Sequence, residues 1–180
     1  MPRLAPLAEP FPPAVAEELV RMMPPGVPPI GLFRTVAHNP RVLARWRAGA
    51  LLDRGSISLR EREIAILRTT ARLGAEYEWG VHVAYFAAKA GLGAAERHAT
   101  VHGGPEAWRG AEAVLVRVVD ALVDDATLGD ALWAEAAAHY PPAQIIEILS
   151  LVGFYHLVAF VANAAGLARE PGAPGFPPAA

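Results

Sequence analysis

Apolar and polar positions follow a helical period between the two ends of the chain, and no stretch alternates with a period of two for long. Residues typical of helix starts and helix ends divide this pattern into separate helices. Ser58 and Glu61 have the spacing of a capping box, and Gly91 ends a helical run. The predicted helices cover residues 14–23, 40–52, 59–73, 76–90, a short segment from 94, 105–123, 130–139 and 141–167. The sequence therefore predicts an all-α fold, a bundle of six to eight helices.

The two ends of the chain differ from the middle in composition. Of the 17 prolines, nine fall in residues 1–29 and four in residues 171–180, where they disfavour helix and sheet. We therefore expect an N-terminal extension with one short helix over residues 1–38, a helical domain over 39–168 and a mobile tail over 169–180.

The overall composition limits the classes of function. With 53% hydrophobic residues among 180, the chain can bury a core of its own. Its net charge of −2 argues against a protein that binds nucleic acid through phosphate contacts. The absence of cysteine excludes disulfides, thiolate metal sites and cysteine nucleophiles. The N-terminus has no continuous apolar stretch, so we expect no secretory signal and a cytoplasmic location.

One apolar segment is long enough to span a bilayer, because residues 148–168 contain no charged side chain. Within it, His156 and Asn163 are seven residues apart and so share one helical face. Polar groups inside such a helix usually face a protein interior. We therefore expect a core or subunit-interface helix and no membrane association.

The predicted helix 59–73 places one carboxylate on its apolar side. Glu63 falls near the centre of the apolar arc, where a carboxylate is costly without a partner. Alternatively, the stem of this side chain lies along the surface, or its carboxylate forms an ion pair with Arg60 or Arg97. In a buried position we expect Glu63 to hold a proton near neutral pH.

The next predicted helix, 76–90, adds an acid–base pair. Glu78 and His82 are four residues apart and share a face, which Tyr85, Phe86 and the single lysine continue. A carboxylate beside an imidazole fixes its tautomer and raises its basicity, as general acid–base catalysis requires. We expect this pair and the glutamate of the preceding helix to converge on one pocket.

Residues 59–92, LREREIAILRTTARLGAEYEWGVHVAYFAAKAGL, resemble the carboxymuconolactone decarboxylase and alkylhydroperoxidase D-like superfamily. The resemblance extends loosely over residues 39–167, including the closing helix with Tyr155, His156 and Asn163. It implies a small all-helical bundle that associates into trimers or hexamers.

The peroxidase branch of that superfamily pairs a glutamate with C-x-x-C-x-x-x-H on the next helix. Over this chain the glutamate falls on Glu63 and the histidine on His82. The two cysteine positions hold Ala75 and Glu78. The chain keeps the proton-relay residues and lacks both sulfurs, so it cannot reduce a peroxide through a disulfide cycle. It is more similar to the decarboxylase branch, whose members work without cysteine, metal or organic cofactor.

Together these observations predict a cofactor-free acid–base lyase or decarboxylase that acts on a small carboxylated lactone or keto acid. We expect His82 to be the general acid–base, Glu63 to donate to the developing enolate oxygen and Glu78 to orient His82. Tyr85 and Phe86 line the predicted substrate pocket. Two alternatives are an alkylhydroperoxidase-like homologue that has lost its redox cysteines and a non-catalytic ligand-binding helical oligomer.

Two metal-site alternatives have weaker support. His98 and His102 have a spacing that can bind a metal, but no third ligand accompanies them. Glu63, Glu78 and His82 together offer two oxygens and one nitrogen. Because the decarboxylase-like relatives work without a metal, we expect none here.

Charge is unevenly distributed along the chain. Residues 41–72 hold eight arginines and three acids, a local +5, whereas residues 106–135 hold seven acids and two arginines, a local −5. This asymmetry indicates two solvated faces, a complementary contact between subunits, or a positive rim that attracts an anionic substrate. The expected partners are therefore a small anionic or carbonyl substrate and further copies of the chain.

Overall fold

The computed structural model describes residues 2–179, except for the side chain of Ala48. Every regular element in this part of the chain is a helix. The α-helices of this part of the chain are α1 (Pro13–Met22), α2 (Gly31–Val36), α3 (Pro40–Gly49), α4 (Leu59–Arg72), α5 (Glu76–His82), α6 (Ala94–His102), α7 (Gly110–Asp125), α8 (Asp130–His139) and α9 (Pro142–Ala165). A π-helical turn, Val83–Ala87, follows α5, and a 3₁₀ turn, Pro105–Ala107, precedes α7. The predicted all-α class is confirmed. The described residues form nine α-helices because α2 adds one that the sequence pattern does not predict.

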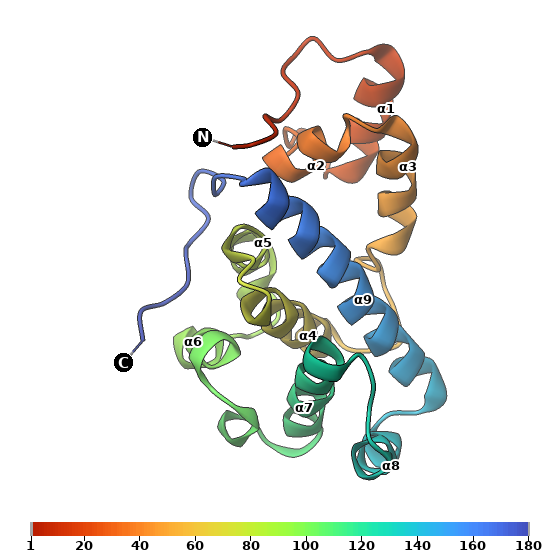
Figure 1. Cartoon of the computed structure of the whole chain (residues 1–180), viewed down its shortest axis with the longest axis vertical. Helices are drawn as coiled ribbons and strands as arrows, with labels where there is room; N and C mark the ends of the chain where they lie inside the picture. The colour runs from red at the N-terminus through yellow and green to blue at the C-terminus, as the bar shows by residue number, and fades with distance from the viewer. Residues whose placement is uncertain (1, 180) are drawn as a thin grey trace.

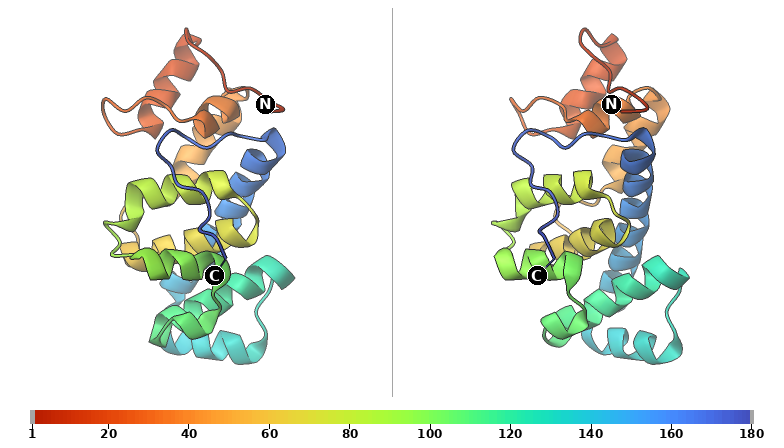
Figure 2. Two further views of the ribbon diagram at one scale, coloured as in Figure 1. Left: turned by 90° about the vertical axis from the view of Figure 1, so that its left-hand side faces the viewer. Right: turned by 60° about the vertical axis from the view of Figure 1, so that its left-hand side comes forward.

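The helices form an elongated bundle around α4 and α9. In Figure 1, α1–α3 lie at one end, α7 and α8 lie at the other, and α9 runs between the two ends. Helix α4 packs against α5, α6, α7 and α9. The two turned views of Figure 2 show the same succession of layers along the long axis. Side chains on α4 are therefore the ones most enclosed by the rest of the molecule.

The start of α4 is fixed by a capping box. The Glu61 backbone N–H donates to Ser58 Oγ at 3.2 Å, and the Ser58 backbone N–H donates to Glu61 Oε2 at 2.9 Å. Both bonds satisfy donors that a helix N-terminus leaves free. This predicted start sets the register of the helix, and that register turns Glu63 toward the core.

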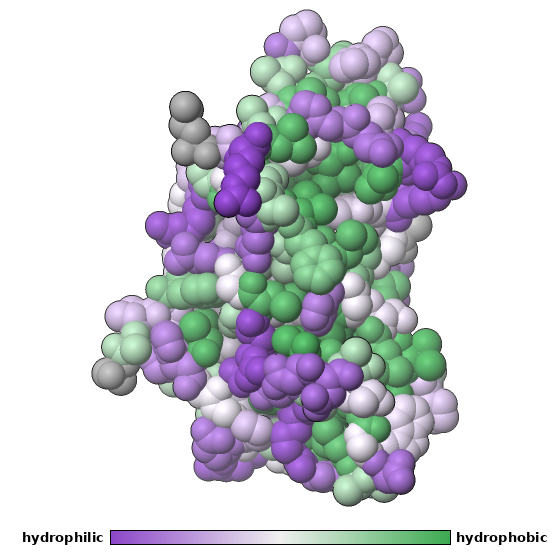
Figure 3. Space-filling model, in the orientation of Figure 1, coloured by the Kyte–Doolittle hydropathy of each residue, from purple (hydrophilic) through white to green (hydrophobic). Residues whose placement is uncertain are grey.

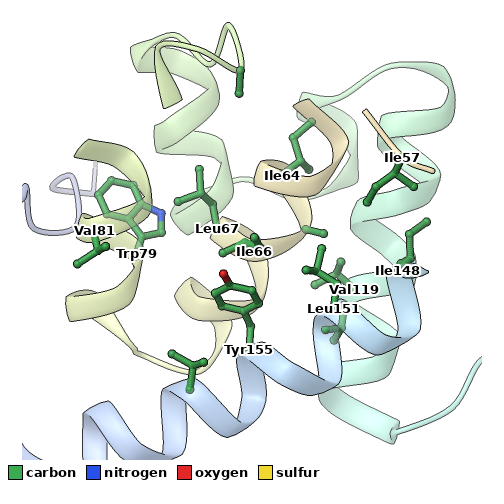
Figure 4. Close-up of a cluster of buried hydrophobic side chains, with 14 of the residues drawn as sticks. Ile57, Ile64, Ile66, Leu67, Trp79, Val81, Val119, Ile148, Leu151 and Tyr155 are labelled. Carbon is green, nitrogen blue, oxygen red and sulfur yellow. The ribbon is translucent and has the colours of Figure 1, made fainter. Parts of the chain in front are cut away.

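The core is built mainly on the buried face of α4. Figure 4 shows Ile64, Ile66 and Leu67 of this helix surrounded by side chains from its neighbours. Those neighbours include Trp79 and Val81 from α5, Val119 from α7, and Ile148, Leu151 and Tyr155 from α9. All of these residues are buried, so α5, α7 and α9 hold α4 from different sides.

Helix α9 is long and apolar enough to cross a membrane by length and composition. The bundle nevertheless covers one side of it, where Ile148, Leu151, Val152 and Tyr155 are buried against the core. A single helix of this kind is weak evidence for a membrane span, because core helices meet the same criteria of length and composition.

Arginines of α4 pair with acids of α7. The pairs are Arg60–Glu112, Arg68–Asp120 and Arg72–Asp124, each separated by 52 residues. Because the separation is constant, the two helices run parallel. The opposite charges of segments 41–72 and 106–135 therefore meet, at these three pairs, inside one chain.

Residues 169–179, whose composition predicts a mobile tail, lie along α5 in the turned views of Figure 2. The Tyr77 hydroxyl donates to Glu170 at 2.5 Å, and the Gly31 backbone N–H donates to the same carboxylate. Further along, the ring of Phe176 packs edge-on against Trp79, with centroids 5.5 Å apart. The tail thus joins α2 to α5.

Candidate active site

Glu63 and His82 form a fully buried pair between α4 and α5. Glu63 Oε2 lies 2.7 Å from His82 Nδ1, and Glu63 has no exposed surface. On its other side, Nε and one terminal nitrogen of Arg62 both lie 2.9 Å from Glu63 Oε1. Arg62 also donates to the Leu52 carbonyl oxygen at 2.8 Å. The buried carboxylate therefore has partners on both sides.

The observed partners of Glu63 differ from Arg60 and Arg97, the ion-pair partners considered from the sequence. The guanidinium of Arg60 bonds to Glu96 and Glu112 and does not reach Glu63. The expectation of a protonated Glu63 assumed a carboxyl group without a partner, whereas a guanidinium and an imidazole both contact this one.

The other nitrogen of His82 faces α9 and the preceding turn of α5. Its Nε2 lies 2.9 Å from the hydroxyl oxygen of Tyr155 and 3.4 Å from Glu78 Oε1. Tyr155 and Glu78 are 2% and 5% exposed. Three helices, α4, α5 and α9, thus bring an arginine, two glutamates, a tyrosine and the imidazole together. The structure places the three residues that the sequence singles out in contact, and their catalytic role stays a prediction.

The surroundings of His82 favour its charged form. Burial acts to lower the pKa of His82, but the charges and hydrogen bonds of Glu63 and then Glu78 outweigh it and raise the pKa to about 9. At neutral pH both ring nitrogens therefore carry a proton. Nδ1–H donates to Glu63, and Nε2–H donates to the Tyr155 hydroxyl oxygen. Burial, together with the charges of Glu78 and Glu63, raises the pKa of Tyr155, so its hydroxyl stays neutral.

A cavity of about 100 Å³ lies against Glu78 and His82. Val81, Tyr85 and Phe86 line it from α5 and the turn that follows. The remaining wall comes from Leu52 and from five residues of the N-terminal segment, Met22, Met23, Pro24, Ile30 and Phe33. The N-terminal extension is therefore part of the site, which nothing in its composition predicts.

The π-helical turn begins directly after His82. Such turns are rare in α-helical segments and occur frequently at functional sites. Here the turn carries Tyr85, 39% exposed, and the half-buried Phe86, whose ring centroid lies 5.1 Å from that of His82. The structure places both aromatic residues on the cavity wall. Their role in substrate binding stays a prediction.

A second, larger hollow of about 390 Å³ adjoins the cavity. It shares Leu52 and Phe86 with the cavity but contains neither Glu78 nor His82. Its charged lining comprises Arg54, Arg62, Lys89, Asp53 and Glu147. The guanidinium carbon of Arg62 and Lys89 Nζ lie 5.3 and 5.8 Å from the ring centroid of Phe86, within the range of cation–π contacts. We call this hollow the basic groove.

Tyr155 and Arg62 are members of the site that the sequence patterns do not single out. For Tyr155 the local signal is weak, a hydroxyl group on a mostly apolar helix. The sequence pattern also offers no means of pairing this residue with His82, 73 positions earlier.

Within residues 2–179 no group of three His, Asp or Glu side chains is arranged to hold a metal ion. His98 and His102 lie close, with ring centroids 4.8 Å apart, and His102 Nε2 lies 2.7 Å from the Pro177 carbonyl oxygen. Neither the pair nor the site trio therefore forms a metal-ligand group.

Comparisons with known proteins relate the chain to solved structures at the level of fold. No family model matches the sequence. No curated protein matches it either. The structure is similar to that of the debrominase Bmp8 in its apo form, with a TM-score of 0.73 and 16% sequence identity. The match covers 94% of this chain and 92% of that one, so the two proteins share the whole helical fold.

Proposed function

We propose that this protein is a cofactor-free acid–base enzyme that moves protons on a small carbonyl compound. One observation carries the proposal: a buried imidazolium and an adjacent carboxylate line the same apolar cavity. Titratable groups whose surroundings hold one as an acid and the other as a base are typical of enzymes that catalyse proton transfer. The debrominase Bmp8 supports the broader statement that a fold of this kind can carry an enzyme.

In the proposed reaction Glu78 is the base and His82 the acid. Glu78 Oε2 takes a proton from the carbon next to the carbonyl group, and the electron pair of that C–H bond moves toward the carbonyl oxygen. Nε2–H of His82 donates its proton to this oxygen, which gives a neutral enol. Glu63 is a positioning residue, because its contact with Nδ1 holds the ring and its charge. The sequence-based expectation differs, since there Glu63 donates to the enolate oxygen and Glu78 orients His82.

Decarboxylation is the specific reaction that the family resemblance favours. When a β-keto acid or carboxylated lactone loses carbon dioxide, the broken C–C bond leaves its electron pair in an enolate, and His82 can protonate that enolate in the same way. The substrate carboxylate would lie in the basic groove, near Arg54 and Lys89. The small anionic or carbonyl substrate expected from the sequence is compatible with this arrangement.

The test is turnover by the purified full chain on β-keto acids and carboxylated lactones, followed by carbon dioxide release. We expect His82→Ala to lower carbon dioxide release by about 100-fold or more. Glu78→Gln should lower the exchange of the proton next to the carbonyl group with solvent by a similar factor, as for the loss of a general acid or base. The exposed histidine variant His102→Ala, matched to the first, should retain the rate of the unmodified protein.

Full turnover by His82→Ala would contradict the acid–base assignment. If the unmodified chain binds these compounds without converting them or exchanging their protons with solvent, the non-catalytic alternative holds instead. Hydroperoxide consumption in a thiol-free assay would favour the peroxidase-related alternative, and we expect none.

We also propose that the chain forms a homo-oligomer through the exposed face of α9, and that it is cytoplasmic. Seven of the exposed residues on this helix are spaced alternately by three and four positions, which is the pattern of a helix–helix seam. They are Ala143, Ile146, Ser150, Gly153, Leu157, Phe160 and Ala164, and we call them the α9 seam. In Figure 3 apolar residues follow the course of α9 across the visible face. The seam contains no charged residue, so a second copy of itself is a suitable partner.

A further inference from the structure

We infer that the cavity binds a small, neutral, ring-sized molecule that donates a hydrogen bond from an O–H or N–H group to Glu78. This inference rests on the proposed function, because it concerns the same site, but it predicts binding rather than turnover. It names the chemistry of the part of the ligand that lies inside the cavity.

The first argument is the unsatisfied oxygen of Glu78. Oε1 faces His82, whereas Oε2 is buried and has no hydrogen-bond partner among residues 2–179. A buried carboxylate oxygen without a donor is unfavourable. None of the nearby donors reaches Oε2: Arg62 bonds to Glu63 and Leu52, the ring nitrogens of His82 face Glu63 and Tyr155, and the Tyr155 hydroxyl lies against His82 Nε2. A ligand that supplies the missing donor therefore gains a hydrogen bond to a charged group.

The second argument is charge. Arg62 pairs with Glu63, and His82 contacts both glutamates, so the buried charges already balance. A carboxylate inside the cavity would add a negative charge beside Glu78. The cations able to compensate it, Arg54 and Lys89, line the basic groove and not the cavity. The cavity therefore selects a neutral group.

The third argument is size and lining. An apolar cavity of about 150 Å³ is large enough to bind benzene. The cavity here has about 100 Å³ and is not closed off from the surface, since Tyr85 on its wall is 39% exposed. Phe33, Phe86 and Met23 offer aromatic and thioether surfaces, which pack well against a flat ring. A single ring with one donor group fits both the space and the free oxygen.

The experiment compares three probes that share a fluorinated benzene ring and differ in the group opposite the fluorine: 4-fluorophenol, 4-fluoroanisole and 4-fluorobenzoate. Each is titrated into the full chain at pH 7, and binding is followed by fluorine NMR. We expect 4-fluorophenol to bind about tenfold more tightly than 4-fluoroanisole, as a hydrogen bond to a charged acceptor implies. The benzoate should bind the cavity most weakly.

Glu78→Gln should reduce the phenol-to-anisole preference to about threefold or less, since a neutral amide oxygen is a weaker acceptor. Glu17→Gln, the same change at an exposed site on α1, should leave the preference unchanged. Phe33→Ala should weaken both neutral probes and keep their ratio. If Glu78→Gln does not fold, the inference is tested by the order of affinity of the three probes for the unmodified chain and for Phe33→Ala.

Equal binding of phenol and anisole, tighter binding of benzoate in the cavity, or an unchanged preference in a folded Glu78→Gln would each overturn the inference. A chain that prefers benzoate but turns over keto acids would lose the ligand assignment and keep the acid–base function. A chain that binds the probes in the expected order, while His82→Ala retains full turnover, would lose the function and keep the ligand assignment.

Discussion

At the scale of single residues, the site is a row of buried charges with alternating sign. Arg62, Glu63, His82 and Glu78 follow one another through contacts of 2.9, 2.7 and 3.4 Å. Buried ions persist in a fold only when each is paired, and in this row the charges sum to zero when His82 is protonated. The row ends on Glu78, whose second oxygen has no partner within the described chain. The residue at the free end of the row is therefore the one available to a ligand.

The same row makes stability depend on pH. The pKa of His82 is about 9 in the folded chain and about 6.5 in an unfolded one. Because the folded state holds the proton more tightly, the stabilisation is fully present below pH 6.5 and is lost as pH rises through 9. Its size is on the order of 3 kcal/mol. Urea unfolding at pH 6.5, 8 and 9.5 should show the free energy of unfolding fall over this interval.

Glu63→Gln provides the comparison for that measurement, because it removes the charge that does most to raise the pKa of His82. The variant should lose much less stability between pH 6.5 and 9.5 than the unmodified chain, whatever its stability at pH 6.5. The other titratable groups are the same in both proteins, so their contributions cancel in the difference. The same pH dependence in both would show that the buried pair is not its source.

At the scale of elements, helices with local signals were predictable and those held by distant contacts were not. Helix α8 matches its predicted range, 130–139, and α4 begins at the capping box. Helix α2 has six residues, too few for a periodic pattern to show or for a helix to persist alone. Its N-terminal N–H groups, at Gly31 and Leu32, donate to Glu170 and Tyr77 far along the chain.

The residues of the site also fall into those that local sequence patterns predict and those that depend on distant contacts. Glu63 stood out because one helix placed a carboxylate among apolar residues, and Glu78 with His82 because four residues is one helical turn. The π-helical turn after His82, the contact with Tyr155 and the wall from residues 22–33 depend on how helices pack. No local pattern encodes these, so they required the structure.

The α4–α7 interface offers a test of buried against exposed ion pairs. Arg68 is 6% exposed in its side chain, bonds to both oxygens of Asp120 and donates to the Gly103 carbonyl oxygen at 2.8 Å. Arg72 is 33% exposed and bonds to the half-exposed Asp124. Arg68→Met should cost about 3 kcal/mol, since it removes both hydrogen bonds to a partly buried carboxylate and leaves Asp120 only a 3.8 Å contact with Arg72. Arg72→Met should cost less than about 1 kcal/mol.

Urea denaturation of the two variants, which carry the same change one helical turn apart, measures this difference directly. Similar losses in both would mean that the burial of Arg68 does not matter to the strength of its contacts with α7. A loss confined to Arg72→Met would reverse the interpretation of the interface.

At the scale of the whole molecule, the C-terminal tail holds in place the N-terminal segment that lines the site. The Arg3 backbone N–H donates to the Ala165 carbonyl oxygen at 2.7 Å, and Glu170 accepts from α2 and from Tyr77 on α5. These contacts tie the N-terminal segment to the end of α9 and to the tail. Because that segment supplies Phe33 and its neighbours to the cavity, both ends of the chain contribute to the shape of the site.

The α9 seam predicts how whole molecules associate. Phe160 and Ile146 are each 61% exposed on a helix whose opposite side is buried in the core, so a second copy can cover this face without unfolding the first.

Phe160→Glu places a charge in the proposed contact, and we expect it to convert the oligomer to a folded monomer with an unchanged melting temperature of the monomer unit. Light scattering after size-exclusion chromatography measures the mass. Val20→Glu, at a 75% exposed apolar site on α1 outside the seam, is the matched control and should remain oligomeric. A monomeric unmodified chain, or equal dissociation of both variants, would mean that α9 does not join the copies.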